Sequence, residues 1–118
     1  MTAKVNDCIF CKIVTGDIPA EIVYESERVL AFRDINAQAP THVQIIPREH
    51  VAKIADFDRS RDTPWLVELI EAAQQIAQDE GLDKGFRLVF NNGALSGQSV
   101  LHVHMHILGG RQLGWPPG

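Results

Sequence analysis

Three of the five histidines in this 118-residue chain occupy every second position of the segment "LHVHMHILGG". Successive side chains of a β-strand point to opposite faces, so His102, His104 and His106 are expected to share one face of a strand. The residues between them are expected to pack in the core on the other face: Leu101, Val103, Met105 and Ile107. The spacing therefore predicts a strand with one apolar face and one face that carries three imidazoles.

Three imidazoles on one face have three interpretations. A structural role is ordinary for a single histidine, but an apolar strand gains nothing from three polar rings in a row. A zinc ion prefers nitrogen or sulfur ligands in a tetrahedron, yet the outer two rings of a straight strand lie about 13 Å apart, too far to share one ion. The third interpretation is phosphoryl or nucleotidyl transfer. Imidazole is a good nucleophile toward phosphorus, and its pKa of about 6.5 lets it act both as the attacking group and as the leaving group near neutral pH.

The loop before the histidines favours transfer chemistry. Its sequence, "NNGALSGQS", is rich in glycines, amides and hydroxyls. Gly93 and Gly97 let backbone N–H groups approach an anion closely, and Gln98 and Ser99 carry donors for phosphate oxygens. Directly followed by the histidines, the loop predicts a phosphate-binding site.

Composition narrows the class of protein. A length of 118 residues and 45% hydrophobic residues are typical of one soluble globular domain. The net charge of −4 argues against partners that need a basic surface, so neither nucleic acid nor an anionic membrane is expected. The N-terminal segment "MTAKVND" has no apolar stretch typical of a signal peptide, and a cytoplasmic location is expected.

Apolar runs and turn residues predict an α+β domain with an antiparallel sheet. The expected elements are a short helix within 7–19 that stops at Gly16, a hairpin over 21–35, a strand over 39–47, one helical turn within 48–57, and strands over 85–93 and 97–108. The main helix is expected to begin with Thr63 as N-cap and Pro64 at its first position, and to stop at Gly81. Its apolar stripe is expected to comprise Leu66, Leu69, Ile70, Ala73, Ile76 and Ala77.

His102 to Leu108 also matches the alternating pattern that names the histidine triad (HIT) superfamily. The chain resembles the Hint branch of that superfamily nearly end to end, and the triad followed by "GGRQ" and the terminal "WPPG" is specific to this branch. The resemblance implies a single HIT domain over residues 1–118, with a five-stranded antiparallel sheet, one long helix and one short helix. It also implies a homodimer in which two protomers form a ten-stranded sheet.

The same resemblance implies a purine nucleoside 5′-phosphoramidate hydrolase that releases AMP or GMP and needs no cofactor for catalysis. His104 would attack the α-phosphorus and form a nucleotidyl-histidine, which water then hydrolyses. His102 would position the nucleophile through its backbone carbonyl. His106 and Ser99 would contact phosphate oxygens, with Ser99 also near the leaving group.

Further binding residues follow from the resemblance. The carboxylate of Asp34 would accept hydrogen bonds from the ribose hydroxyls. Asn91 would lie on the phosphate or leaving-group side of the substrate, and Gly97 and Gln98 would belong to the phosphate-binding loop. Trp115 in the tail would reach across the dimer to the partner's site. The apolar purine slot would comprise Ile9, Phe10, Ile13, Phe32 and Ile35.

Cys8 and Cys11 form a C-x-x-C pair that many Hint members lack. In a reducing compartment such a pair indicates metal ligands or redox thiols rather than a structural disulfide. Similarity to bacterial HIT proteins with this pair implies a structural zinc ion, held by Cys8, Cys11, His50 and His102. His42 is interpreted as a structural residue at the end of a strand.

Two other functions stay open at this stage. The chain could be a nucleotide-binding adaptor whose catalysis is incidental, or an enzyme of the same fold that hydrolyses dinucleoside polyphosphates. The "WPPG" tail argues against the second, because a longer pocket would need the room that the tail takes.

Overall fold

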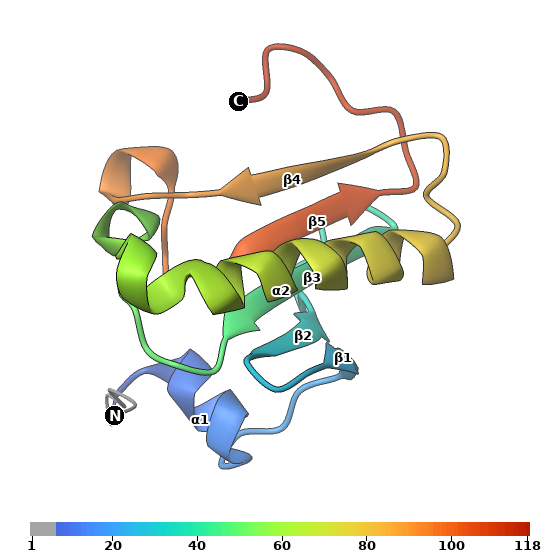
Figure 1. Cartoon of the computed structure of the whole chain (residues 1–118). Helices are drawn as coiled ribbons and strands as arrows, with labels where there is room; N and C mark the ends of the chain where they lie inside the picture. The colour runs from blue at the N-terminus through green and yellow to red at the C-terminus, as the bar shows by residue number, and fades with distance from the viewer. Residues whose placement is uncertain (1–6) are drawn as a thin grey trace.

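The computed structural model describes residues 7–118, which form an α+β fold around one sheet. Five antiparallel strands lie in the order β1-β2-β3-β5-β4 (Figure 1). Two helices and two short 3-10 turns accompany them, and the bounds in chain order are α1 Ile9–Thr15, β1 Ile22–Glu25, β2 Val29–Arg33, β3 Thr41–Pro47, η1 Ile54–Asp56, α2 Arg59–Asp79, β4 Phe86–Phe90, η2 Ala94–Ser96 and β5 Met105–Gly109. The predicted fold class, five-stranded antiparallel sheet and long and short helices are confirmed. No helix in residues 7–118 is long and apolar enough to cross a membrane.

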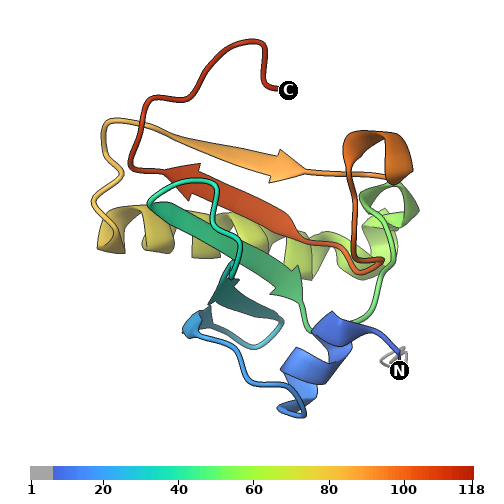
Figure 2. The ribbon, with the colours of Figure 1, turned by 180° about the vertical axis from the view of Figure 1, so that it is seen from behind.

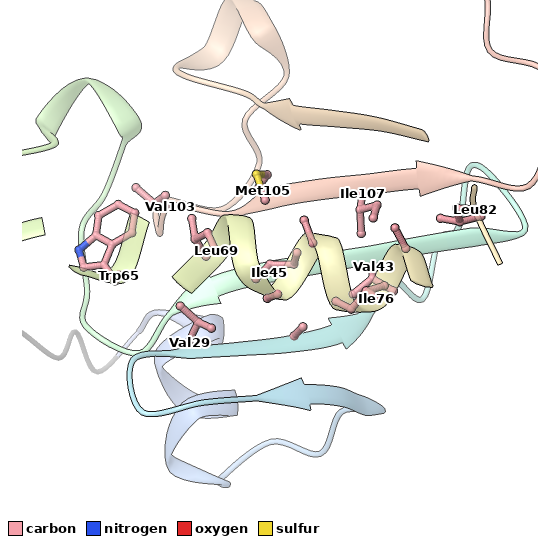
Figure 3. Close-up of a cluster of buried hydrophobic side chains, with 14 of the residues drawn as sticks. Val29, Val43, Ile45, Trp65, Leu69, Ile76, Leu82, Val103, Met105 and Ile107 are labelled. Carbon is pink, nitrogen blue, oxygen red and sulfur yellow. The ribbon is translucent and has the colours of Figure 1, made fainter. Parts of the chain in front are cut away.

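Helix α2 covers one face of the sheet and closes the main core. Trp65 and Leu69 of the helix pack against strand residues that alternate toward it (Figure 3). Side chains that lie directly opposite each other in an antiparallel pair share a face, and Val43 pairs with Ile107 on this one. The labelled strand and loop residues of this core are Val29, Val43, Ile45, Leu82, Val103, Met105 and Ile107.

The opposite face of the sheet carries α1 and a second, smaller apolar cluster. Leu30, Phe32 and Ile46 point to this side and pack with Phe10 of α1. His106 pairs with Gln44, which alternates with Ile46, so the triad side of β5 lies on the same face as α1. Figure 2 shows the molecule from this side, with α1 beside the end of β3. This face is therefore the one that positions the candidate site.

Strand β5 begins later than the sequence pattern predicts. Its ladder with β3 stops at the pair Ile45 and Met105, so His102 and His104 lie in an irregular segment before the strand. The ladder cannot continue to Pro47, which has no backbone N–H. The N–H of Val103 instead donates to the carbonyl of Val51 at 2.7 Å. The prediction of three histidines on one strand is therefore wrong.

One residue of the expected core face also departs from the pattern. Leu101 is 61% exposed, whereas the other three alternate residues are buried. Leu101 precedes the strand by four positions, where period-two alternation no longer applies.

Helix α2 begins earlier than predicted. Asp58, not Thr63, is the N-cap, and its carboxylate accepts from the N–H of Ser60 at 2.9 Å. The carboxylate of Asp62 accepts from the N–H of Asp58 at 2.8 Å, so the two aspartates stabilise the first turn reciprocally. Pro64 lies inside the helix, and the hydroxyl of Thr63 donates to the carbonyl of Arg59.

The buried stripe of α2 differs in part from the predicted one. Ile70, expected in the core, is 42% exposed, while Trp65 and Ala72 are buried in addition to the predicted Leu69, Ala73, Ile76 and Ala77. The earlier start of the helix brings Trp65 into its second turn, where its indole N–H donates to Asp62 at 2.9 Å. The predicted stop is confirmed, since α2 ends at Asp79 and Gly81 follows with a φ of 68°.

Candidate functional site

His104 is held in the tautomer that a nucleophile needs. Its Nδ1–H donates to the backbone carbonyl of His102 at 2.8 Å, so the lone pair of the neutral ring is on Nε2. Burial lowers the pKa of His104, which keeps the ring neutral at pH 7. The expected positioning of the ring by the His102 carbonyl is present in the structure.

A chain of hydrogen bonds also assigns the protons of His42 and His106. The backbone N–H of Gln38 donates to Nδ1 of His42 at 3.0 Å, so the proton of neutral His42 is on Nε2. That Nε2–H donates to Nδ1 of His106 at 2.8 Å. The proton of His106 is then on Nε2, where it can donate to a phosphate oxygen. Burial, aided by the charges of His104 and His42, lowers the pKa of His106 to about 4.

Asp34 lies beside the same chain of imidazoles. One carboxylate oxygen accepts from the N–H of Asn36 at 2.8 Å, and the other is 3.4 Å from Nε2 of His42. The expected ribose-binding carboxylate and the triad thus belong to one site, with His42 between them. His42 lies near the start of β3, where a structural residue at the end of a strand is expected, and its buried ring also contacts His106 directly.

The sequence indicates the position of His42, but its contact with His106 can be predicted only if the order of the strands is known. Alternation along "THVQII" places His42, Gln44 and Ile46 on one face. Only the pairing of β3 with β5 shows that this face is the one that carries His106. Sequence spacing alone could not show that pairing.

The glycine-rich loop is folded around two residues in the left-handed region. Gly93 and Gly97 have φ values of 85° and 89°, which favour glycine, and they flank the turn η2. The side chain of Gln98 closes the loop: it accepts from Gly93 N–H at 2.8 Å and donates to the carbonyls of Ala52 and Val100. Both donors of Gln98, expected to face phosphate, are therefore engaged with carbonyls. Ser99 is exposed at the end of the loop.

The expected purine residues differ in exposure. Ile9 and Ile35 are 46% and 104% exposed, and Ile13 is half-buried. Phe10 and Phe32 are buried and meet edge to face, with ring centroids 5.3 Å apart. The ring centroid of Phe10 also lies 5.2 Å from that of His104, so the structure brings Phe10 to the expected nucleophile.

Two expected residues lie at the outer strand and the tail. Asn91, half-buried, directly follows β4. Trp115 is 84% exposed, and its neighbour Gly114 accepts from Arg87 of β4 at 2.7 Å. The tail is therefore anchored on β4, one of the two edge strands of the described sheet.

Four potential metal ligands converge between α1 and the triad. The ligand atoms of Cys8, Cys11, His50 and His102 all lie within 4.8 Å of one another. Nδ1 of His102 is 3.4 Å from Sγ of Cys8 and 3.2 Å from Nδ1 of His50. The structure thus assembles the predicted set of two thiols and two imidazoles.

The tautomer of His102 shows that this set fits a metal ion. Nε2–H of His102 donates to the carbonyl of Pro47 at 2.8 Å, so Nδ1 is unprotonated and points into the cluster. Burial lowers the pKa of His102 to about 4, which keeps that lone pair free. Facing imidazole nitrogens need a proton or a cation between them. Two nitrogens and two sulfurs are the donors that tetrahedral zinc prefers, and the carbonyl of Pro47 would orient the ligand.

A second group of three ligands does not fit a metal ion. Asp34, His42 and His106 also have ligand atoms within 4.8 Å of one another. A metal ion on Nε2 of His42 would move the proton to Nδ1, where it would face the N–H of Gln38. Nδ1–H of His42 and the backbone N–H of Gln38 would then be two donors that face each other. The group therefore serves hydrogen bonding rather than metal binding.

The sequence of this domain matches a known family over most of its length. Residues 15–113 match the HIT domain. The chain belongs to the HIT family. Its five-stranded antiparallel sheet and two helices are those of the HIT fold.

Relatives of known sequence and structure cover nearly the whole chain. A "14 kDa zinc-binding protein" from Brassica juncea is 46% identical and aligns over 95% of this chain and 100% of the relative. The crystal structure of a HIT family hydrolase from Legionella pneumophila has a TM-score of 0.92, 51% identity and coverage of 95% of this chain and 100% of that one. A histidine triad nucleotide-binding protein from Candida albicans has a TM-score of 0.79 and 32% identity, covering 93% of this chain and 83% of that one.

Proposed function

We propose that this HIT protein is a purine nucleoside 5′-phosphoramidate hydrolase of the Hint type. The observation that carries the proposal is the hydrogen bond from Nδ1 of His104 to the carbonyl of His102, which leaves Nε2 free for attack. The names of two structural relatives, a hydrolase and a nucleotide-binding protein, support the same class of activity. The terminal "WPPG" supports the Hint branch.

The reaction has two steps. Nε2 of His104 bonds to the α-phosphorus as the phosphorus–nitrogen bond breaks, and the amine takes up a proton as it leaves. Water then attacks the same phosphorus, the bond to His104 breaks, and AMP or GMP is released. Nε2–H of His106 and the hydroxyl of Ser99 would donate to phosphate oxygens in both transition states. Asp34 would accept from the ribose hydroxyls.

The experiment that tests this proposal is capture of the intermediate. Protein mixed with adenosine 5′-phosphoramidate and quenched during turnover is expected to gain the mass of one adenylyl group, mapped to the peptide with His104. The His104→Ala variant serves as the control and should gain none. Turnover without adduct on any histidine, at full rate in His104→Ala, would refute covalent catalysis by this residue.

We also propose that Cys8, Cys11, His50 and His102 hold a structural zinc ion. The fit of the donor set supports this, and so does the name of the Brassica juncea relative. The ion would cross-link α1 to the triad segment, while His104 stays free for chemistry. Elemental analysis is expected to find one zinc per chain and none in Cys11→Ser. A metal-free protein of unchanged stability would contradict this assignment.

The protein is further proposed to act as a homodimer joined along β4. This strand is one of the two edge strands of the described sheet, and Phe86 and Leu88 on it are 41% and 37% exposed. An exposed apolar edge strand favours pairing with a second chain. Pairing of two such edges would extend the sheet to ten strands and bring each tail, with Trp115, toward the partner.

A further inference from the structure

Helix α1 carries two sets of residues within two turns. Cys8 is its N-cap and Cys11 lies in its first turn. Both belong to the metal cluster, which comprises the four candidate ligands Cys8, Cys11, His50 and His102. Ile9, Phe10 and Ile13, on the same turns, are three of the five residues expected to contact the purine. A change in the position of this short helix would therefore affect both the metal and the nucleotide.

The polar attachment of α1 to the rest of the domain depends on the two thiols. Within residues 7–118, the side-chain hydrogen bonds that join this helix and its cap to the segments after β3 and before β5 run from Cys8 or Cys11 to His50 and His102. The remaining attachment is the small apolar cluster on this face. A helix of seven residues is not stable on its own, so its position is set by these contacts.

His102 and Phe10 connect the metal cluster to the nucleophile. Through Nδ1, His102 faces the thiols, and its backbone carbonyl holds Nδ1 of His104 at 2.8 Å. The ring of Phe10 lies edge-on to both, with centroids 6.0 Å from His102 and 5.2 Å from His104. Movement of α1 would therefore change the packing around the nucleophile.

One cavity also joins the metal cluster to the phosphate loop. It has a volume of about 480 Å³, and its lining includes Cys8, His50, Ile9 and Ser99. A ligand in contact with Ser99 would thus lie beside the face of the cluster.

We infer that metal binding at Cys8, Cys11, His50 and His102 and nucleotide binding at the triad are coupled through α1, so that each strengthens the other. The inference rests on the proposed nucleotide chemistry of this site. Without the ion, His50, His102 and the two thiols lose their common partner, and α1 is held only by thiol–imidazole hydrogen bonds of 3.3–3.6 Å and by the small apolar cluster. The nucleotide must then order the helix as it binds, which weakens its affinity.

The coupling is reciprocal by thermodynamic necessity. Coupling between two sites typically amounts to a factor of about 5 to 150, and we expect about tenfold here. The affinity for AMP should fall about tenfold when zinc is removed, and the affinity for zinc should rise by the same factor when AMP is saturating.

Calorimetric titration of AMP into the zinc-loaded protein and into protein dialysed against a chelator tests the inference. The double variant Cys8→Ser/Cys11→Ser should bind AMP as weakly as the dialysed protein, with or without added zinc. Lys12→Ala is the matched control on α1, because it keeps both thiols, and it should bind AMP as the parent does. Equal AMP affinity with and without zinc would overturn the coupling and leave the proposed function standing. No AMP binding to either form would overturn the proposed function, and the coupling with it.

Hydrogen exchange measured by mass spectrometry distinguishes a local effect from unfolding. Removal of zinc is expected to expose the amides of α1, while those of α2 and β3 stay protected. Loss of protection in α2 and β3 as well would overturn the inference, because zinc would then support the whole fold rather than this helix.

Discussion

At the scale of single residues, the site is defined by the tautomers of four histidines: His42, His102, His104 and His106. Carbonyls of His102 and Pro47 and the N–H of Gln38 determine the tautomers of His104, His102 and His42. These three partners are backbone groups, so three of the tautomers follow from the fold, and the fourth, that of His106, follows from the side chain of His42. The sequence pattern predicts which histidines are present but not which nitrogen of each is free.

The role of His42 leads to a test at this scale. His42→Ala removes the donor to Nδ1 of His106 and leaves the proton of that ring free to move between its nitrogens. Leaving a buried hydrogen-bonding group without its partner typically costs about 1–3 kcal/mol, which corresponds to about 5-fold to 150-fold in rate. We expect kcat for adenosine 5′-phosphoramidate to fall in this range with little change in KM.

Gln38→Ala is the control for that test, because it keeps the backbone N–H that orients His42. It should retain the parental kcat. An unchanged kcat in His42→Ala would show that the tautomer of His106 does not matter for turnover.

At the scale of elements, the sequence predicts which segments form strands and helices better than where they begin. Five strands and two helices are found where apolar runs and turn residues indicate them. The predicted starts of β5 and α2 are wrong, because the start of a strand depends on partners distant in the chain and the start of a helix depends on which of several residues acts as the N-cap. Pro47, on the neighbouring strand, ends the ladder of β5, and Asp58, five residues before Thr63, is the N-cap of α2. Local patterns contain neither fact.

The first turn of α2 yields a test of stability against pH. Asp62 is fully buried, and its hydrogen bonds with Arg61 lower its pKa from 3.8 to about 2. Because the folded-state pKa is the lower one, the unfolded chain binds more protons between these values, and the stabilisation is present above about pH 4 and lost as pH falls toward 2. Asp62→Asn should lower the free energy of unfolding by about 2 kcal/mol at pH 7, with a difference that shrinks below pH 4.

Urea denaturation at several pH values measures this difference. Asp83→Asn is the comparison, since Asp83 is exposed and outside the helix cap. A difference between parent and Asp62→Asn that stays constant from pH 7 to pH 2 would contradict the role assigned to the carboxylate.

At the scale of the whole molecule, one face of the sheet carries the main core and the other carries the candidate site. Helix α2 covers the first face, and α1, the four candidate metal ligands and the triad lie on the second (Figure 1). The outer edge at β4 is left for the proposed partner, and the tail lies next to it. This division explains how a chain of 118 residues builds a site without opening its core.

The proposed dimer is tested at the exposed edge. Leu88→Lys places a charge on β4, and sedimentation is expected to show a dimer for the parent and a monomer for the variant. Turnover should fall in the variant as well, since the tail of the partner would no longer reach the site. Asp17→Lys, an exposed change after α1, should stay dimeric. A parental protein that sediments as a monomer at all concentrations would contradict the dimer.

Hydrolysis of the phosphorus–nitrogen bond can be followed directly by phosphorus NMR. Purified protein is mixed with adenosine 5′-phosphoramidate in one tube and with a diadenosine polyphosphate in another. We expect rapid conversion of the phosphoramidate to AMP and an unchanged spectrum of the polyphosphate. Cleavage of the polyphosphate alone, or binding of AMP with no cleavage in either tube, would refute the proposed activity.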